Sequence, residues 1–167
     1  MKVLSLDQSF TNCAWSIWEN NKLYDFGVIS TDTSESLAKR IVFIVSKLKD
    51  IILENEISQV VLEGIILKGR ITPSSPSLAG LFYCIEILCD SLDIPCEDIP
   101  PPSIKKVWSG KGNASKVDME KACPEALLSV IMSSPYKTLN KGRRDLIDSF
   151  AVYKAWVELR QDNKEDN

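Results

Sequence analysis

The chain begins with the segments KVLSLD at residues 2–7, CAWSIW at residues 13–18 and LYDFGVIS at residues 23–30, and these segments decide its fold. Each segment has the length and the apolar content of a β-strand. The residues between the second and third segments, Glu19 to Lys22, include two consecutive asparagines and are typical of a hairpin turn. The sequence therefore predicts three strands with short turns at the N-terminal end, which form an antiparallel meander.

The segments after the meander alternate between helical and strand patterns. Apolar residues recur at spacings of three and four over residues 32–55, where Asp32 and Glu35 form a capping-box pattern. The other predicted elements are a strand at 57–63, a loop at 64–77, a helix at 78–92, an edge strand at 94–99, short helices at 103–108 and 115–122, and a long helix at 142–160. This order predicts an α/β fold with a mixed five-stranded sheet and helices on both faces. We expect one domain over residues 1–160 and a frayed tail over residues 161–167.

Composition excludes several kinds of chemistry. The chain has 167 residues, 44% of them hydrophobic, and contains no histidine, which excludes Ser-His and Cys-His triads and makes most zinc sites improbable. Its five cysteines form no CxxC pair, so we expect them to be reduced core residues. Any chemistry must therefore come from carboxylates, lysines and hydroxyls.

The N-terminal segment and the overall hydropathy argue against a membrane protein. No stretch approaches the roughly 20 apolar residues that a membrane span requires. Asp7 interrupts the apolar N-terminus too early for the core of a signal peptide. We therefore expect a cytoplasmic protein without a membrane partner, located in the host cytoplasm if the chain is encoded by a phage.

The net charge of −3 conceals a segregation of charge along the chain. No lysine or arginine lies between Ile71 and Ile104, whereas lysines outnumber acids from Ser103 to Lys121. Because a phosphate responds to the local charge of a surface, an acidic protein with this pattern can still present a basic face to nucleic acid.

Four carboxylates are candidates for a metal site. Asp7 ends the first predicted strand and Glu63 ends the fourth, so adjacent parallel strands would place both at the same edge of the sheet. Asp145 and Asp148 lie three residues apart and share one face of the last helix. Four carboxylates in one cleft repel one another and require cations, and hard oxygen ligands select Mg²⁺ or Mn²⁺. Two such ions about 4 Å apart are the arrangement that hydrolyses phosphodiesters.

These residues resemble a known family. Residues 6–15, LDQSFTNCAW, are similar to the opening strand and turn of RuvC-type resolvases, and residues 61–64, VLEG, resemble the family's strand that ends in glutamate. Residues 145–151, DLIDSFA, resemble its C-terminal helix. Lys105 and Lys116 match the spacing of two functionally important lysines of the family. The resemblance extends over nearly the whole chain.

The resemblance implies a ribonuclease H-like fold, a homodimer, and paired symmetric nicks in Holliday junctions and other branched DNA. The residues that it assigns to two Mg²⁺ ions, for which Mn²⁺ would substitute, are Asp7, Glu63, Asp145 and Asp148. It implies that these four and Lys116 are catalytic in a metal-dependent endonuclease without an organic cofactor. The DNA-binding residues that we expect are Lys68, Arg70, Lys105, Lys106, Lys111, Lys116, Arg143 and Arg144.

Three features bear on how such a protein would engage DNA. Gln8 stands where a proline is common in the family, and Ile66 stands where some relatives carry an aromatic wedge. The helix at residues 78–92 carries an apolar stripe that fits either the core or a contact between subunits; the stripe consists of Leu81, Phe82, Ile85, Leu88 and Cys89.

Other functions share part of this pattern. The same metal site would serve a ribonuclease H-like nuclease that acts on RNA or on an RNA–DNA hybrid. A phosphotransferase of the sugar-kinase and actin type opens with a similar turn, but it needs two domains and glycine-rich loops, and this chain has 7 glycines. A non-catalytic nucleic-acid-binding module would have no use for four acids beside a phosphate.

Overall fold

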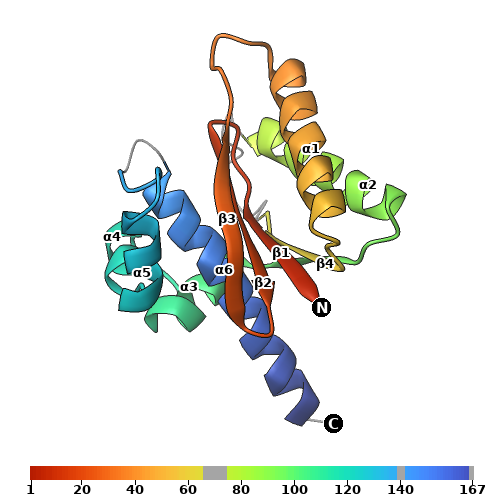
Figure 1. Ribbon diagram of the computed structural model, residues 1–167. Coiled ribbons are helices and arrows are strands. Elements are labelled where there is room, and N and C mark those ends of the chain that lie inside the picture. The colour runs from red at the N-terminus through yellow and green to blue at the C-terminus, as the bar shows by residue number, and fades with distance from the viewer. Residues whose placement is uncertain (66–74, 139–141, 166–167) are drawn as a thin grey trace.

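A computed structural model describes residues 1–65, 75–138 and 142–165 (Figure 1). The strands are β1 (Lys2–Asp7), β2 (Asn12–Glu19), β3 (Lys22–Ser30), β4 (Gln59–Glu63) and β5 (Cys96–Ile99). The helices are α1 (Leu37–Glu54), α2 (Ser75–Ser91), α3 (Pro101–Ser109), α4 (Lys116–Lys121), α5 (Glu125–Met132) and α6 (Arg143–Glu165). The predicted loop at 64–77 lies mostly outside the described residues, and α2 begins inside its predicted range.

The strands form one mixed five-stranded sheet in the order β3-β2-β1-β4-β5. β1 pairs with β2 and β2 with β3 in antiparallel fashion, whereas β4 is parallel to both of its neighbours, β1 and β5. The turn between β2 and β3 holds Asn20 and Asn21 at positive φ, which is the backbone of a tight hairpin turn. The predicted meander, the parallel crossover and the edge position of β5 are therefore confirmed.

Helices cover both faces of the sheet (Figure 1). α1 and α2 pack on one face around Leu4, Leu6 and Ile44, and α6 packs on the other face around Val3, Phe150 and neighbouring apolar residues. α3, α4 and α5 flank α6 on its side of the sheet. The alternation of side chains along β1 explains this division, because Leu4 and Leu6 point to one face and Val3 to the other.

Several helix ends differ from their predicted positions. α1 begins at Leu37 with Ser36 as its N-cap, so the capping box predicted at Asp32 and Glu35 is wrong. The Asp32 carboxylate instead accepts hydrogen bonds from the backbone N–H and the hydroxyl of Ser34, which stabilises a turn before the helix.

Prolines and one missed helix account for the other differences. The helix predicted at residues 103–108 begins two residues earlier, at Pro101, because proline is well accommodated in the first turn of a helix. α5 was not predicted. α6 continues to Glu165 and therefore includes most of the residues predicted to form a frayed tail. Among the described residues, no helix is long and apolar enough to cross a membrane.

The cysteines and the apolar stripe of α2 are buried or partly buried. All five cysteines are free; Cys13, Cys89 and Cys123 are buried, and Cys84 and Cys96 are partly buried. The predicted stripe of α2 is buried against the sheet, and no member exceeds 8% exposure. The stripe therefore belongs to the core, and any contact between subunits must use another face of α2.

A buried cluster of three hydroxyls joins α6 to the sheet. Ser16 on β2 lies at its centre, because its Oγ is 2.7 Å from Ser5 Oγ on β1 and 3.3 Å from Ser149 Oγ on α6. The Trp18 indole N–H also donates to Ser16 Oγ at 2.9 Å. Ser149 follows Asp148 in the chain, so this cluster fixes α6 at the turn that carries a candidate site residue.

We expect Ser16→Ala to lower the free energy of unfolding by about 1–3 kcal/mol, because it leaves several buried polar groups without a shared partner. Urea unfolding measures this change. Ser46→Ala, at an exposed position in the middle of α1, is the matched control and should change stability by less than about 0.5 kcal/mol. Equal stabilities of the two variants would contradict the role given to this cluster.

Candidate active site

Asp7 and Glu63 lie where two parallel strands separate. The pairing of β1 with β4 ends at Leu6 and Leu62. One residue later, Asp7 pairs with β2 and Glu63 pairs with β5. The two carboxylates therefore sit side by side at the carboxyl edge of the sheet, as the sequence predicts, and the gap between their strands opens a space for ligands.

Helix α6 brings two more carboxylates to this edge. A cavity of about 280 Å³ contains the predicted set of acids together with residues of α3 and α4; its lining consists of Asp7, Ser9, Glu63, Ile104, Lys105, Lys116, Met119, Asp145, Asp148 and Val152. Asp145, Asp148 and Val152 follow one another along a single face of α6, in agreement with their spacing of three and four. α6 begins directly after Gly142, which has a φ of +93° and lies where an added Cβ would come within 2.8 Å of Val28 on β3.

Burial raises the pKa of three acids in the cavity, and neighbouring carboxylates raise two of these values further. Burial raises the pKa of Asp7 well above its usual value, and the negative charges of Asp148, Glu63 and Asp145 raise it further. Burial also raises the pKa of Glu63. For Asp148, burial is again the largest cause, and with the charges of Glu63 and Asp145 it raises the pKa from 3.8 to about 6. These carboxylates are thus close enough to interact strongly in a poorly solvated space.

Two lysines partly offset this negative charge. Lys105 on α3 and Lys116 at the start of α4 both line the cavity, as their predicted roles require. Their charges lower the pKa of Glu63 and of Asp148, in opposition to burial. Because two ammonium groups face four carboxylates, the cavity keeps an excess of negative charge.

The donor set fits a hard divalent cation. All four acids offer carboxylate oxygens, which are the ligands that Mg²⁺ and Mn²⁺ prefer, and neither a thiolate nor an imidazole lines the cavity. Within residues 1–65, 75–138 and 142–165, no three acidic or cysteine side chains are already arranged to hold a single metal ion. The four carboxylates line one cavity as a looser set, whose excess negative charge is the property that favours a cation.

The other predicted DNA-binding residues differ in their surroundings. The side chains of Lys106 on α3 and of Lys111 on the loop that follows it are exposed. Lys68 and Arg70 lie outside the described residues, as does Ile66.

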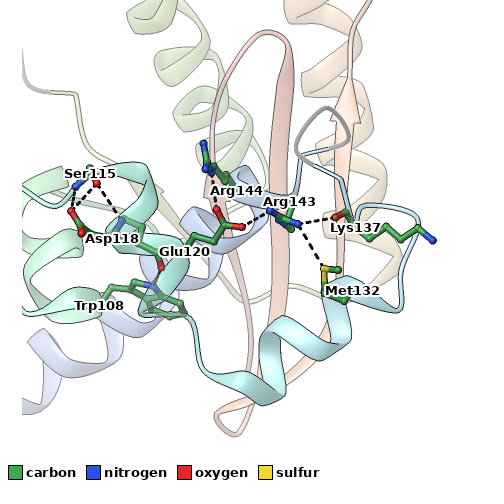
Figure 2. Close-up of polar contacts among 9 residues, drawn as sticks. Trp108, Ser115, Asp118, Glu120, Met132, Lys137, Arg143 and Arg144 are labelled. Atoms are coloured by element: carbon green, nitrogen blue, oxygen red, sulfur yellow. Dashed lines mark hydrogen bonds and ion pairs between the residues drawn. The ribbon is translucent and has the colours of Figure 1, made fainter.

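Arg143 and Arg144 are held by an acid that the sequence analysis did not single out. Arg143 Nη2 is 2.5 Å from Oε1 of Glu120, and Arg144 Nε is 3.0 Å from Oε2 of the same carboxylate (Figure 2). Burial alone would raise the pKa of Glu120, but the hydrogen bonds and charges of Arg144 and Arg143 lower it below its usual value.

Two further side chains support the acids from neighbouring elements. Gln8 follows Asp7, and its Nε2 donates to the backbone carbonyl of Glu63 at 2.5 Å, across the gap between β1 and β4. Asn12 Nδ2 donates to Oδ2 of Asp145 at 3.4 Å. Gln8 was identified only as a departure from the family pattern, and its proximity to Asp7 in the sequence was the available signal. Asn12 gave no comparable signal, because its partner lies 133 residues away.

Comparison with known proteins finds the same architecture. The chain is 27% identical over 155 residues to the crossover junction endodeoxyribonuclease RuvC of Ehrlichia chaffeensis. The aligned residues cover 91% of this chain and 93% of that protein. The structure of Thermus thermophilus RuvC in complex with a Holliday junction substrate superposes with a TM-score of 0.68 at 13% identity, over 95% of this chain and 96% of that one.

A eukaryotic resolvase has a similar fold. The yeast mitochondrial Holliday junction resolvase superposes with a TM-score of 0.62 at 17% identity, over 92% of this chain and 76% of that one. No protein-family model matches the chain. The sheet order, the helices on both faces and these similarities identify the fold as the ribonuclease H-like fold of RuvC-type resolvases.

We expect Asp148→Asn to stabilise the protein in EDTA at pH 7.5 by about 1–3 kcal/mol, because each pKa unit corresponds to about 1.4 kcal/mol. The pKa of Asp148 is higher in the folded chain than in the unfolded chain, so the stability falls as the pH rises from about 4 to about 6, and the full cost of its ionisation is present above pH 6. That cost disappears as the pH falls toward 4, and the variant and the parent should then have similar stabilities. Urea unfolding at pH 4.5 and 7.5 measures both differences. A stabilisation independent of pH would contradict this electrostatic explanation.

Proposed function

We propose that this chain, which has the fold of the RuvC-type resolvases and resembles RuvC over 91% of its length, is a Mg²⁺-dependent endonuclease that cuts Holliday junctions. The observation that carries the proposal is the cavity at the carboxyl edge of the sheet, where Asp7, Glu63, Asp145 and Asp148 line one space together with two lysines. This set of residues is suited to phosphodiester hydrolysis and offers little to other chemistry.

The four carboxylates would hold the divalent cations, with Mn²⁺ able to replace Mg²⁺. Cations bound there supply the activation of water and the neutralisation of charge on the phosphate that hydrolysis requires. The chain's own contribution is to present oxygen ligands from two strand ends and one helix face. Gln8 holds the ends of β1 and β4 together, and the buried hydroxyl cluster fixes α6 against the sheet.

The lysines would contact the DNA backbone. Lys105 and Lys116 line the cavity together with the acids, where they can pair with phosphate oxygens and neutralise charge that develops during cleavage. Lys106 and Lys111 are exposed and would extend the positive surface along the backbone. Arg143 and Arg144 have less freedom to do so, because both are paired with Glu120.

Similarity favours a DNA junction over RNA as the substrate. The proteins that match along most of their length are named as a crossover junction endodeoxyribonuclease and as Holliday junction resolvases. A non-catalytic binding module is disfavoured by the cavity itself, because four carboxylates beside a phosphate would weaken binding.

We expect Asp7→Asn and Glu63→Gln to abolish cutting of a synthetic four-way junction in Mg²⁺, whereas junction binding persists or becomes tighter because negative charge near phosphate is removed. Nicking and gel-shift assays on the same preparations separate the two effects. Glu54→Gln, at an exposed position at the end of α1, is the matched control and should cut at the parent's rate. A Glu63→Gln variant with full activity would show that the site is misassigned.

An exposed apolar surface on the opposite face of the sheet from the cavity supports a homodimer. Ile87 and Tyr83 on α2 are 66% and 57% exposed, and Val42 on α1 is 68% exposed. A groove of about 490 Å³ lies between the two helices and is lined by Ile87 and Val42. Contiguous apolar surface of this kind marks interaction sites. A two-fold dimer would present two identical cavities to a two-fold symmetric junction.

We expect Ile87→Lys to convert a dimer into a monomer, because it places a charge on this apolar surface. Ile87 is 66% exposed in the single chain, so the change should disturb the fold itself little. Sedimentation at micromolar concentration should report about twice the chain mass for the parent and one chain mass for the variant. Val130→Lys, at a 43% exposed position on α5, is the control and should remain dimeric. A monomeric parent that still makes coupled nicks in a cruciform plasmid would contradict the dimer.

A further inference from the structure

Glu120 joins helix α4, on which it lies, to the start of helix α6, and both helices carry residues that line the cavity. It lies on α4, one turn after Lys116, and therefore on the same side of that helix. Its carboxylate faces the first turn of α6 (Figure 2). Each of its two oxygens contacts a different arginine, Arg143 at 2.5 Å and Arg144 at 3.0 Å.

We propose that Glu120 is a positioning residue, which holds Lys116 and Asp145 at the cavity. Its carboxylate also keeps the charges of two arginines from the DNA. This inference rests on the proposed function.

The pairing is partly shielded from water. The side chains of Glu120 and Arg143 are 21% and 22% exposed, and that of Arg144 is 32% exposed. An ion pair at this depth is less screened than one on the open surface, and a carboxylate that engages two guanidinium groups is geometrically specific. Arg143 is also fixed by a hydrogen bond from Nη1 to the backbone carbonyl of Lys137, at 3.3 Å.

This contact links two helices that line the cavity. α4 has only six residues, so it depends on contacts with the rest of the fold, in addition to its capping box, to hold Lys116 in one place. The Trp108 indole N–H donates to the Met119 carbonyl at 2.9 Å and thereby ties α3, which carries Lys105, to α4. Glu120 then ties α4 to the start of α6, where Arg144 immediately precedes Asp145. The contacts of Trp108 and Glu120 thus join the three helices that carry the two lysines and Asp145.

The same contact lowers the positive charge beside the cavity. One carboxylate and two guanidinium groups carry a net charge of +1, and loss of the carboxylate charge would raise this to +2. Glu120→Gln keeps the size of the side chain but removes its charge. Because affinity for DNA rises with local positive charge, this variant should bind a junction more tightly although its lysines and Asp145 are less well positioned. A variant that merely destabilised the fold would instead lower binding and cleavage together.

The experiment compares the parent chain with Glu120→Gln on a four-way junction in Mg²⁺. We expect single-turnover cleavage at saturating protein to fall about tenfold or more, a loss typical of misplaced catalytic groups. Junction affinity in EDTA should rise, and the slope of log affinity against log salt should steepen by about 1, as for one additional phosphate contact. Glu120→Asp, which keeps the charge, should retain the parent's salt slope and recover part of the cleavage.

Glu125→Gln provides the control, because it makes the same change of charge at an exposed position on the neighbouring helix α5. It should match the parent in cleavage and in salt slope. Cleavage by Glu120→Gln at the parent's rate would overturn the inference, and so would a joint loss of binding and cleavage in both Glu120 variants. A parent that leaves the junction intact would overturn the proposed function and, with it, this inference.

Discussion

Four carboxylates line one partly buried cavity, and their negative charges repel one another. Burial and mutual repulsion raise the pKa of Asp7 and bring that of Asp148 to about 6. Such an arrangement lowers the stability of the protein at neutral pH, so it persists only because stronger interactions fix the elements that carry it. Lys105 and Lys116 offset part of the charge, and the remainder favours a divalent cation.

The fold meets this constraint by placing each acid on an element that is anchored elsewhere. Asp7 and Glu63 end two strands whose preceding residues are fully buried, and the strands separate at the edge where the acids lie. α6 is fixed against the sheet by the hydroxyl cluster around Ser16, and its first turn is fixed to α4 by Glu120. The acids are thus held at one edge by contacts of the elements that carry them, to which Asn12 adds a hydrogen bond to the Asp145 carboxylate.

The sequence predicted the sheet and the four acids because each acid ends an apolar run or recurs at helical spacing. Other features depend on tertiary contacts that leave no local pattern. Glu120 looks like any surface acid on a short helix, because its partners lie 23 and 24 positions away. α5 has only eight residues, too few for a helical period to stand out. The start of α1 was misplaced because Asp32 and Ser36 are both good capping residues, and only the folded chain determines which one caps the helix.

The proposed nuclease activity depends above all on what the unmodified chain cuts. The protein is incubated with a synthetic four-way junction, a linear duplex and an RNA–DNA hybrid of matched sequence, each in Mg²⁺ and in EDTA, and the nick positions are mapped on both strands. A resolvase of this kind should make two symmetric nicks in opposed strands of the junction, in Mg²⁺ only, with little cutting of the duplex or the hybrid. Cutting that persists in EDTA, or that favours the hybrid over the junction, would contradict it.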